Sequence, residues 1–396
     1  MPARVFTAPE LNVDERAVLE LIGELREQMR SRGIAEPRRW AGGLRRMSEA
    51  RAVQQSNSIE GYNASLDDVI AVHDGDEPMD ASEETQLALE GYQEAMTYVL
   101  QAAKDPELTV DEGLLRALHF MMIKHDLSKN PGRWRPGAIH VARTDTGEIV
   151  YEGPDADLVP GLIAEMLEDL QSDCPVLVKA AMAHLNLAMI HPFSDGNGRM
   201  ARCLQTLVLA REQIVAPVFS SIEEYLGRNT QQYYDVLAEI GRGSWHPEND
   251  ARPWVRFCLT AHYRQAKTVL RRLDAFHEMW TVASRIAEGR RLPERTVGPI
   301  AEAAYGLRIR RATYLQSVEI TWGEPIADLT ASRDLRALVN AGLLIPIGDT
   351  RGRYYVGTDD LKAEWQQIRN KWPREPEADD PFNIVAERAQ LKLDVA

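Results

Sequence analysis

Apolar residues recur at helical spacing along most of the chain. From about residue 13 to 32 they fall at Val18, Leu21, Ile22, Leu25 and Met29, which form one stripe of an amphipathic helix. The same period marks further stretches at about 44–53, 66–72, 85–103, 111–124, 158–171, 175–190, 199–212, 222–240 and 252–288. This pattern predicts a mainly α-helical fold.

Two short runs of β-favouring residues interrupt the helical pattern. They cover 138–142 and 149–151, and they flank the turn-forming stretch RTDTGE. Alternating residues on either side of such a turn are typical of two antiparallel strands. We therefore expect one β-hairpin within otherwise helical surroundings.

The pattern changes again near Pro293. Short helical pieces are followed by a predicted helix over about 332–341 and by the strand–turn–strand stretch GLLIPIGDTRGRYYVG. This order predicts a winged helix-turn-helix, with a boundary at about 289–295. Three regions result: a helical N-terminal region over 1–104, a core with its following helices over 105–288, and a C-terminal winged-helix region with a tail over 289–396.

Composition narrows the class of protein. The 396 residues carry a net charge of −14, which argues against a nucleic-acid or anionic-membrane surface over the whole chain. No run of about 18 apolar residues occurs, and the first residues lack the pattern of an export signal. The three cysteines, Cys174, Cys203 and Cys258, are widely spaced and odd in number. We expect a cytoplasmic protein with reduced thiols.

Candidate chemistry concentrates in the stretch HPFSDGNGRMAR, residues 191–202, which separates two apolar helices. Gly196 and Gly198 allow a tight turn that exposes backbone amides at the start of the second helix, where an anion is favoured. Arg199 and Arg202 are three residues apart and share one face of its first turn. This combination predicts a phosphate site.

Two further residues of the stretch suit a reaction at that phosphate. Asp195 offers a hard oxygen ligand for Mg²⁺ next to the exposed amides. His191 ends the preceding helix, where it can act as a general base near neutral pH. Each residue alone has ordinary structural roles, but together and in this order they predict attack on a metal-bound polyphosphate.

The stretch resembles the Fic motif, His-x-Phe-x-(Asp/Glu)-Gly-Asn-Gly-Arg-x-x-Arg, at every defined position. The resemblance implies a helical Fic core that transfers AMP from ATP to a hydroxyl side chain of a target protein or of itself. His191 would be the base, Phe193 the anchor of the loop, and Asp195 the Mg²⁺ ligand. The ATP phosphates would lie against Gly196, Asn197, Gly198, Arg199, Met200, Ala201 and Arg202, with Arg202 facing the γ-phosphate.

Two other segments resemble parts of this family. The predicted hairpin, within GRWRPGAIHV and IVYEGP, is similar to the family's flap, which holds the target as an added strand. QQYYDVL resembles the helix beside the adenosine, so Tyr233 and Tyr234 are candidates for an adenine pocket. Core packing is the competing role for both rings. The family also often dimerises, which makes a homodimer a candidate assembly.

The stretch SNSIEG, residues 56–61, fits the family's inhibitory pattern (Ser/Thr)-x-x-x-Glu-(Gly/Asn) through Ser56, Glu60 and Gly61. A glutamate delivered to Arg202 would satisfy that charge and fill the space of the γ-phosphate. We therefore expect an autoinhibited transferase. A further hypothesis is that Glu60 orients a water for removal of AMP.

Arginines in the C-terminal region leave a function of another class open. Arg333, Arg336, Arg351 and Arg353 fall on the predicted recognition helix and wing, and Arg285, Arg290, Arg291, Arg295, Arg308, Arg310 and Arg311 precede them. Duplex DNA binding is one alternative, and protein contacts or dimerisation is the other. Within the enzyme class, a Fic-type transferase can move phosphate, UMP or phosphocholine in place of AMP.

Overall fold

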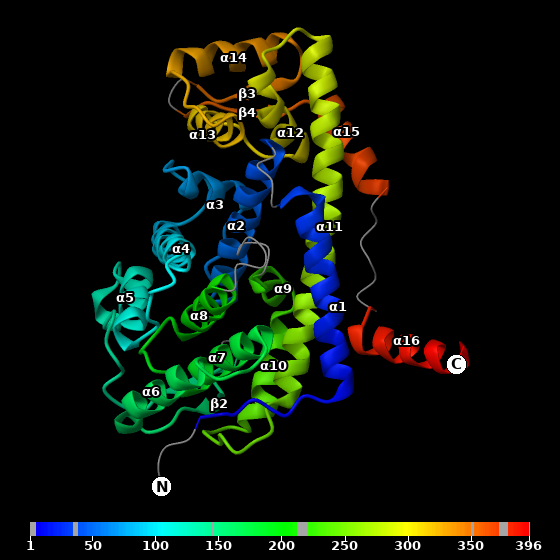
Figure 1. Cartoon of the computed structure of the whole chain (residues 1–396). Coiled ribbons are helices and arrows are strands. Elements are labelled where there is room, and N and C mark those ends of the chain that lie inside the picture. The colour runs from blue at the N-terminus through cyan, green and yellow to red at the C-terminus, as the bar shows by residue number, and fades with distance from the viewer. Residues whose placement is uncertain are drawn as a thin grey trace.

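The computed structural model describes residues 5–34, 39–143, 146–211, 221–349, 352–371 and 379–395. The described residues form a mainly helical molecule with two small antiparallel hairpins (Figure 1). The N-terminal part contains α1 (Val13–Met29), which a short π-helix extends over Arg30–Ile34, then α2 (Arg39–Ile59), α3 (Leu66–His73) and α4 (Glu83–Ala102). The expected helical N-terminal region is therefore present.

The central part carries the predicted hairpin between helices. Its elements are α5 (Glu112–Ile123), β1 (His140–Ala142), β2 (Ile149–Glu152), α6 (Val159–Asp169), α7 (Val176–Ile190), α8 (Asn197–Arg211), α9 (Glu223–Arg228), α10 (Thr230–Gly241) and α11 (Arg252–Gly289). Strands β1 and β2 pair antiparallel with Val141 opposite Tyr151. Short 3₁₀ turns cover Leu127–Lys129 and Ala156–Leu158.

Side-chain caps explain where several helices begin. Asn12 and Glu15 form a capping box at α1, in which each side chain accepts a hydrogen bond from the other residue's backbone N–H. Ser65, Ser82 and Asp111 each accept from the backbone N–H three residues later, at α3, α4 and α5. These polar residues stand directly before apolar-periodic runs, so local sequence specifies the helix starts.

One helix predicted from its period is broken in the structure. The stretch 222–240 forms α9 and α10, separated at Asn229, whose backbone leaves the helical region at φ −123° and ψ 39°. The Asn229 side chain donates to the carbonyl of Tyr225 at 2.8 Å. An asparagine that bonds nearby backbone competes with the helical ladder, and the apolar period does not reveal that competition.

The C-terminal part is a helical unit with its own hairpin. It contains a 3₁₀ turn (Glu294–Thr296), α12 (Val297–Tyr305), α13 (Arg311–Trp322), α14 (Asp328–Asn340), β3 (Leu344–Ile347), β4 (Tyr354–Gly357) and α15 (Asp359–Lys371). Strands β3 and β4 pair antiparallel. Three helices followed by a hairpin are typical of a winged helix-turn-helix.

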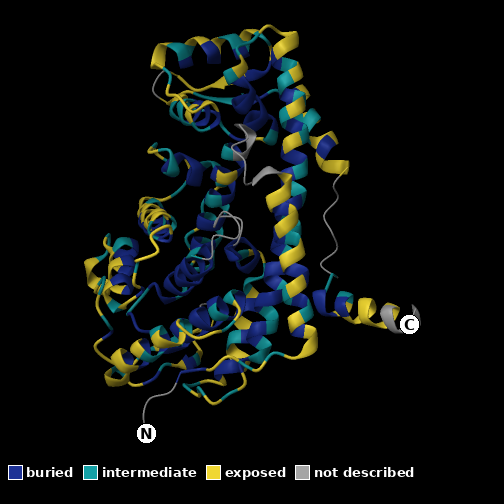
Figure 2. Cartoon of the chain, viewed as in Figure 1, coloured by how far each residue is buried: buried dark blue, intermediate teal, exposed yellow. Residues whose placement is uncertain are grey.

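Two hydrophobic cores follow from this arrangement. The first joins residues of the N-terminal and central parts, including Val18, Leu89 and Leu204, so these parts share one core. The second lies in the C-terminal unit and begins inside α11 at Ala275. The long helix α11 runs through both, and its apolar side is covered along its length (Figure 2).

The last helix packs away from the C-terminal unit. Helix α16 (Pro381–Val395) contacts α1, and Phe382 and Val385 join the first core. Arg256 of α11 lies 3.7 Å from the centre of the Phe382 ring. No helix among the described residues is long and apolar enough to span a lipid bilayer.

Candidate active site

His191 lies where α7 ends, in a left-handed backbone conformation with φ 52°. Its Nδ1 lies 3.0 Å from the carbonyl oxygen of Ala188. A carbonyl can only accept, so Nδ1 carries the proton and Nε2 keeps its lone pair. Burial lowers the pKa of His191. The imidazole is therefore neutral near pH 7, with Nε2 able to take up a proton.

The loop after His191 is held from within. Asn197 accepts from the Phe193 backbone N–H at 2.9 Å and donates to the Phe193 carbonyl at 2.8 Å. Phe193 is fully buried, as the resemblance predicts for an anchor. The Asn197 side chain is thus used in closing the loop, and its part in an anion site is confined to its backbone amide.

The start of α8 presents free backbone amides. The first bond of the helix runs from the Met200 N–H to the Gly196 carbonyl at 2.9 Å. The amides of Asn197, Gly198 and Arg199 therefore precede the helical ladder, at the positive end of the helix dipole. Gly196 has φ +74°, where a side chain would be strained. These features agree with the predicted anion site.

Arg199 is buried next to this helix end but is not neutralised. It is 1% exposed, and its Nε and Nη1 atoms have no hydrogen-bond partner among the described residues. Its guanidinium lies 5.1 Å from the centre of the Tyr62 ring. A buried cation without a hydrogen-bonded anion is costly, so the site is suited to an anionic ligand.

Three hydrogen bonds join Arg202 to the segment that carries the predicted inhibitory residues, and its Nη1 has no hydrogen-bond partner among the described residues. Its Nε donates to the Ser56 hydroxyl at 2.7 Å, and its Nη2 donates to the Ser56 carbonyl at 2.9 Å and to Glu60 Oε1 at 2.6 Å. Burial alone would lower the pKa of Arg202, but the Glu60 carboxylate reverses this and raises it. Arg202 is fully buried and the Glu60 side chain is 25% exposed, so this pair is partly shielded from water.

Glu60 also covers the start of α8. A Cβ atom placed on Gly198 would lie 2.3 Å from Glu60 Oε1 and 3.1 Å from Arg202 Nη1. Gly198 is therefore needed for the carboxylate to approach this closely. Gly61, the last residue of the predicted pattern, has φ +90° and turns the chain away after Glu60.

Asp195 is aimed by its own loop toward a cavity. Its Oδ1 accepts from the Gly196 N–H at 2.6 Å, and its Oδ2 lies 3.5 Å from Lys129 Nζ. A cavity of about 360 Å³ adjoins Asp195 and Arg199, and Asp126 and Lys129 line it as well.

The residues present fit a magnesium ion that is shared with phosphates. The described residues contain no group of three or more His, Cys, Asp or Glu side chains that could hold a metal ion. Mg²⁺ is commonly held by one or two carboxylates together with phosphate and water oxygens. Asp195, with one oxygen directed to the cavity, is suited to that arrangement and not to a site built from protein alone.

The predicted tyrosine pair divides into two different positions. Tyr233 is 2% exposed, and its hydroxyl lies 3.0 Å from His184 Nε2 in the core. Tyr234 is 46% exposed, and its hydroxyl donates to the carbonyl of Ile59 at 3.2 Å. Tyr234 is therefore the member of the pair that remains accessible to a ligand, and it also contacts the end of α2.

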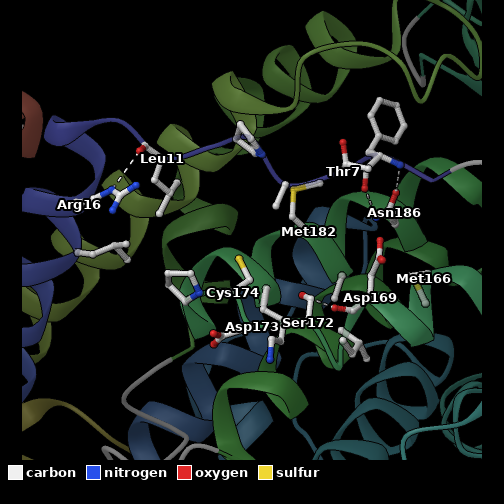
Figure 3. A pocket seen from close by; sticks show the side chains of 18 residues that line it. Thr7, Leu11, Arg16, Met166, Asp169, Ser172, Asp173, Cys174, Met182 and Asn186 are labelled. Atoms are coloured by element: carbon white, nitrogen blue, oxygen red, sulfur yellow. Dashed lines mark hydrogen bonds between the residues drawn. The ribbon is translucent and has the colours of Figure 1, made fainter.

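Met200 and Ala201 lie within the ATP-binding run that the motif predicts, but their side chains are fully buried in the first core. They pack α8 against its neighbours, so contact with a nucleotide is confined to their backbone. A separate cavity of about 530 Å³ lies between the N-terminal segment, α6 and α7, and includes Thr7, Met166 and Cys174 (Figure 3). No residue of 191–202 lines it.

Sequence reasoning missed two residues that hold the site. Arg135 lies between the loop and the hairpin: its Nε donates to the His191 carbonyl at 2.8 Å and its Nη1 to the Gly137 carbonyl at 2.6 Å, while Nη2 bonds the Pro154 carbonyl. His119 of α5 stacks on the Phe193 ring, and its Nε2 lies 2.9 Å from the Asp195 carbonyl oxygen. The sequence offered two signals for these residues. Arg135 is a cation within the stretch GRWRPG, and His119 is a lone histidine on the apolar face of α5.

Comparison with known proteins gives a family match for the central part of the chain. A Fic/DOC family model matches residues 109–209. Protein adenylyltransferase Fic of Nematostella vectensis is 27% identical over 246 residues, 58% of this chain and 49% of that protein. Protein adenylyltransferase fic-1 of Caenorhabditis elegans is 33% identical over 116 residues, 27% of this chain and 20% of that protein. The chain thus matches half or less of each relative's length.

Solved structures agree at the level of fold. A Fic family protein from Desulfovibrio desulfuricans G20 superposes with a TM-score of 0.57 at 23% identity, over 90% of this chain and 99% of that one. Fic-1 from C. elegans gives a TM-score of 0.51 at 20% identity, over 66% and 73%. Residues 109–209, which contain the whole motif 191–202, are therefore a Fic/DOC family domain in a mostly helical Fic fold.

Proposed function

We propose that this protein is an adenylyltransferase that moves AMP from ATP to a hydroxyl side chain of a protein. The observation that carries the proposal is the contact of His191 Nδ1 with the Ala188 carbonyl oxygen, which leaves Nε2 as a proton acceptor in the loop that leads into the free amides of α8. A general base next to an anion site is what attack of a hydroxyl on a phosphate requires. Relatives that are named protein adenylyltransferases support this activity.

The reaction assigns one role to each group. His191 Nε2 accepts the proton of the target hydroxyl, and the oxygen forms a bond to the α-phosphorus. The bond from that phosphorus to the β-phosphate oxygen breaks, and pyrophosphate leaves. The amides of Asn197 and Gly198 stabilise the charge that develops on the α-phosphate oxygens. Arg199, whose Nε and Nη1 have no hydrogen-bond partner in the described part of the chain, is placed to receive the departing phosphates.

Asp195 would hold Mg²⁺ through the oxygen that faces the cavity. When bound, the ion supplies positive charge that neutralises the phosphates. Tyr234, the exposed member of the tyrosine pair, would contact the adenosine side. The hairpin β1–β2 would hold the target segment as an added strand, since an edge strand offers unpaired backbone groups.

We also propose that Glu60 inhibits the enzyme. Its carboxylate takes up the guanidinium of Arg202 and lies against Gly198, where the outer phosphates of ATP would bind. A nucleotide then lacks the second arginine and is held without the geometry needed for transfer. Removal of the Glu60 side chain alone would free both Arg202 and the space beside Gly198. Relief of inhibition therefore needs no large movement of the chain.

Replacement of Glu60 tests the proposal. Glu60→Gly is expected to raise the incorporation of labelled AMP from [α-³²P]ATP into proteins of a cell lysate, by about tenfold or more if Arg202 alone restores the phosphate contact. His191→Ala in the same background is the control and should abolish incorporation. Equal incorporation with and without Glu60 would refute the inhibitory role.

Mass spectrometry of the labelled protein identifies the transferred group and the acceptor. AMP, UMP, phosphate and phosphocholine add different masses, so one spectrum separates the proposed reaction from the alternatives. A modified serine, threonine or tyrosine with the mass of AMP supports adenylyl transfer. Any other added mass would replace it with another Fic-type transfer.

Glu60 is also proposed to activate a water for removal of AMP, because its carboxylate lies at the phosphate end of the site. Target protein that has been modified by Glu60→Gly enzyme is incubated with wild-type or Glu60→Gly enzyme without ATP. Loss of AMP is expected with the wild-type chain and much slower loss with the variant. Equal rates would rule out this second role.

A further inference from the structure

His119 joins three parts of the site that are far apart in sequence. It lies on α5 and is fully buried. Its ring stacks on Phe193 with centroids 3.7 Å apart and planes 8° from parallel. Its Nδ1 lies 2.8 Å from the Gly132 nitrogen, and its Nε2 lies 2.9 Å from the Asp195 carbonyl oxygen. One imidazole therefore connects the helix, the segment that leads to the hairpin, and the loop.

The partners determine which nitrogen carries the proton. A backbone N–H can only donate, so Nδ1 of His119 accepts from Gly132. A carbonyl can only accept, so Nε2–H donates to Asp195. Both bonds are made by the neutral ring in a single tautomer. Protonation would remove the acceptor that Gly132 requires.

The peptide between Asp195 and Gly196 connects His119 to the carboxylate of Asp195. In a planar trans peptide the C=O and N–H point in opposite directions. His119 holds the C=O side, and the N–H side donates to Asp195 Oδ1 at 2.6 Å. That bond leaves Oδ2 directed toward Lys129 and the cavity. Rotation of the peptide would turn the carboxylate away.

The surroundings leave this peptide little room to find another position. A Cβ on Gly196 would lie 2.9 Å from Ile123 Cδ1 and 3.5 Å from His119 Nε2. Gly132 has φ +73°, and a Cβ there would lie 3.1 Å from the Arg116 carbonyl oxygen. The loop and the Gly132 segment are therefore closely packed on either side of the imidazole.

We propose that His119 is a positioning residue for nucleotidyl transfer, which fixes the Asp195–Gly196 peptide and thereby aims the Asp195 carboxylate at the cavity where it would hold Mg²⁺. The proposal rests on the proposed adenylyl transfer. His119 does not itself touch the reacting atoms. Its loss should therefore lower turnover more than it weakens nucleotide binding, because the α8 amides and Arg199 remain.

The test compares two substitutions in the Glu60→Gly background. His119→Phe keeps the ring stacked on Phe193 but loses both hydrogen bonds, and kcat is expected to fall on the order of 10- to 100-fold, as for a small misplacement of a reacting group. The ATP dissociation constant should change only a few-fold. His119→Gln offers one acceptor and one donor, and it is expected to recover much of the lost turnover.

His262→Phe is the matched control. His262 is also a buried histidine, and it lies on α11, outside the loop and α5. It should leave kcat unchanged, and melting temperatures of all variants verify folding. Turnover of His119→Phe equal to that of His262→Phe would overturn the proposal. The proposal would also be overturned if His119→Phe lowered only the affinity for ATP, or if His119→Gln turned over as slowly as His119→Phe.

A second measurement separates this proposal from the proposed activity. Nitrogen-15 NMR of the wild-type histidine rings, assigned through the missing signals of His119→Phe, should show the Nε2–H tautomer for His119. Protonation at Nδ1 would contradict the contacts that carry the proposal, whatever the enzyme transfers. Absence of AMP transfer by the Glu60→Gly chain would instead refute the activity, with the tautomer unaffected.

Discussion

At the scale of the residue, Arg199 and Arg202 differ although they share one helix turn. Among the described residues, Arg202 makes three hydrogen bonds to Ser56 and Glu60 and keeps Nη1 without a partner, whereas Arg199 has both Nε and Nη1 without a partner and lies against Tyr62. Their sequence positions make them equivalent phosphate contacts. The structure makes Arg199 available and Arg202 occupied, so the state of Arg202 is what a regulator has to change.

His191 supports a prediction about pH. Burial lowers its pKa below the ordinary value of 6.5. The base form is the neutral form, so a lowered pKa keeps the base active at more acidic pH. The acidic limb of kcat/KM for the Glu60→Gly chain, measured against pH, is expected to have its midpoint below pH 6.5. A midpoint above that value would contradict the assignment of His191.

At the scale of the element, α2 links the residues proposed to inhibit the enzyme to the C-terminal unit. Its last turn carries Ser56, while its first half packs on α13. Near that contact, buried Arg46 lies 3.4 Å from Asp74 and 3.5 Å from Glu302 of α12. A Cβ on Gly42 would lie 2.3 Å from Ile320 Cγ2 of α13. The helix is therefore closely seated on the C-terminal unit.

A shift of α2 relative to α13 should move Glu60, which follows the last residue of α2. Gly42→Leu forces α2 and α13 apart, and a helix moves as a unit, so the 2.6 Å contact between Arg202 and Glu60 should lengthen. We expect AMP incorporation to rise a few-fold in the chain that keeps Glu60. In the Glu60→Gly background the same substitution should add nothing. A rise in both backgrounds would show that the effect does not pass through Glu60.

At the scale of the whole molecule, ion pairs use many of the C-terminal arginines. Arg295 donates to both oxygens of Asp334, and Arg308 and Arg310 pair with Asp80 and Asp76 of the segment between α3 and α4. These pairs join the C-terminal unit internally and to the N-terminal part. Arg333 and Arg336 are exposed, as is Arg353, while Arg351 lies outside the described residues.

This distribution of charge favours protein contacts over nucleic acid. Many arginines of the basic set are paired with carboxylates, and the chain as a whole carries −14. Electrostatic binding to DNA weakens steeply between about 50 and 200 mM salt. Mobility-shift assays with duplex DNA are expected to show no binding of this kind. DNA binding would be established if the chain bound duplex DNA with a steep salt dependence and if the double variant Arg333→Ala, Arg336→Ala lost that binding.

Local features of the sequence determined most of the helices, both hairpins and the motif 191–202. Helical period, capping residues and turns act over a few neighbouring residues, so they can be read without the fold. The resemblance of SNSIEG to an inhibitory pattern likewise predicted the pairing of Glu60 with Arg202. The two hydrogen bonds from Arg202 to Ser56 were not predicted. The break at Asn229 was not predicted, because the apolar period continues through this residue. The break goes with a hydrogen bond from its side chain to the backbone, which the period does not reveal.

Tertiary structure alone decided which distant side chains meet. His119 reaches Asp195 across 76 residues, and Arg135 reaches His191 across 56. It also separated Tyr233 in the core from Tyr234 at the surface, and directed the side chains of Met200 and Ala201 inward. Such contacts depend on how whole helices pack, and packing selects neighbours by shape and hydrogen-bond satisfaction, which no short stretch of sequence contains.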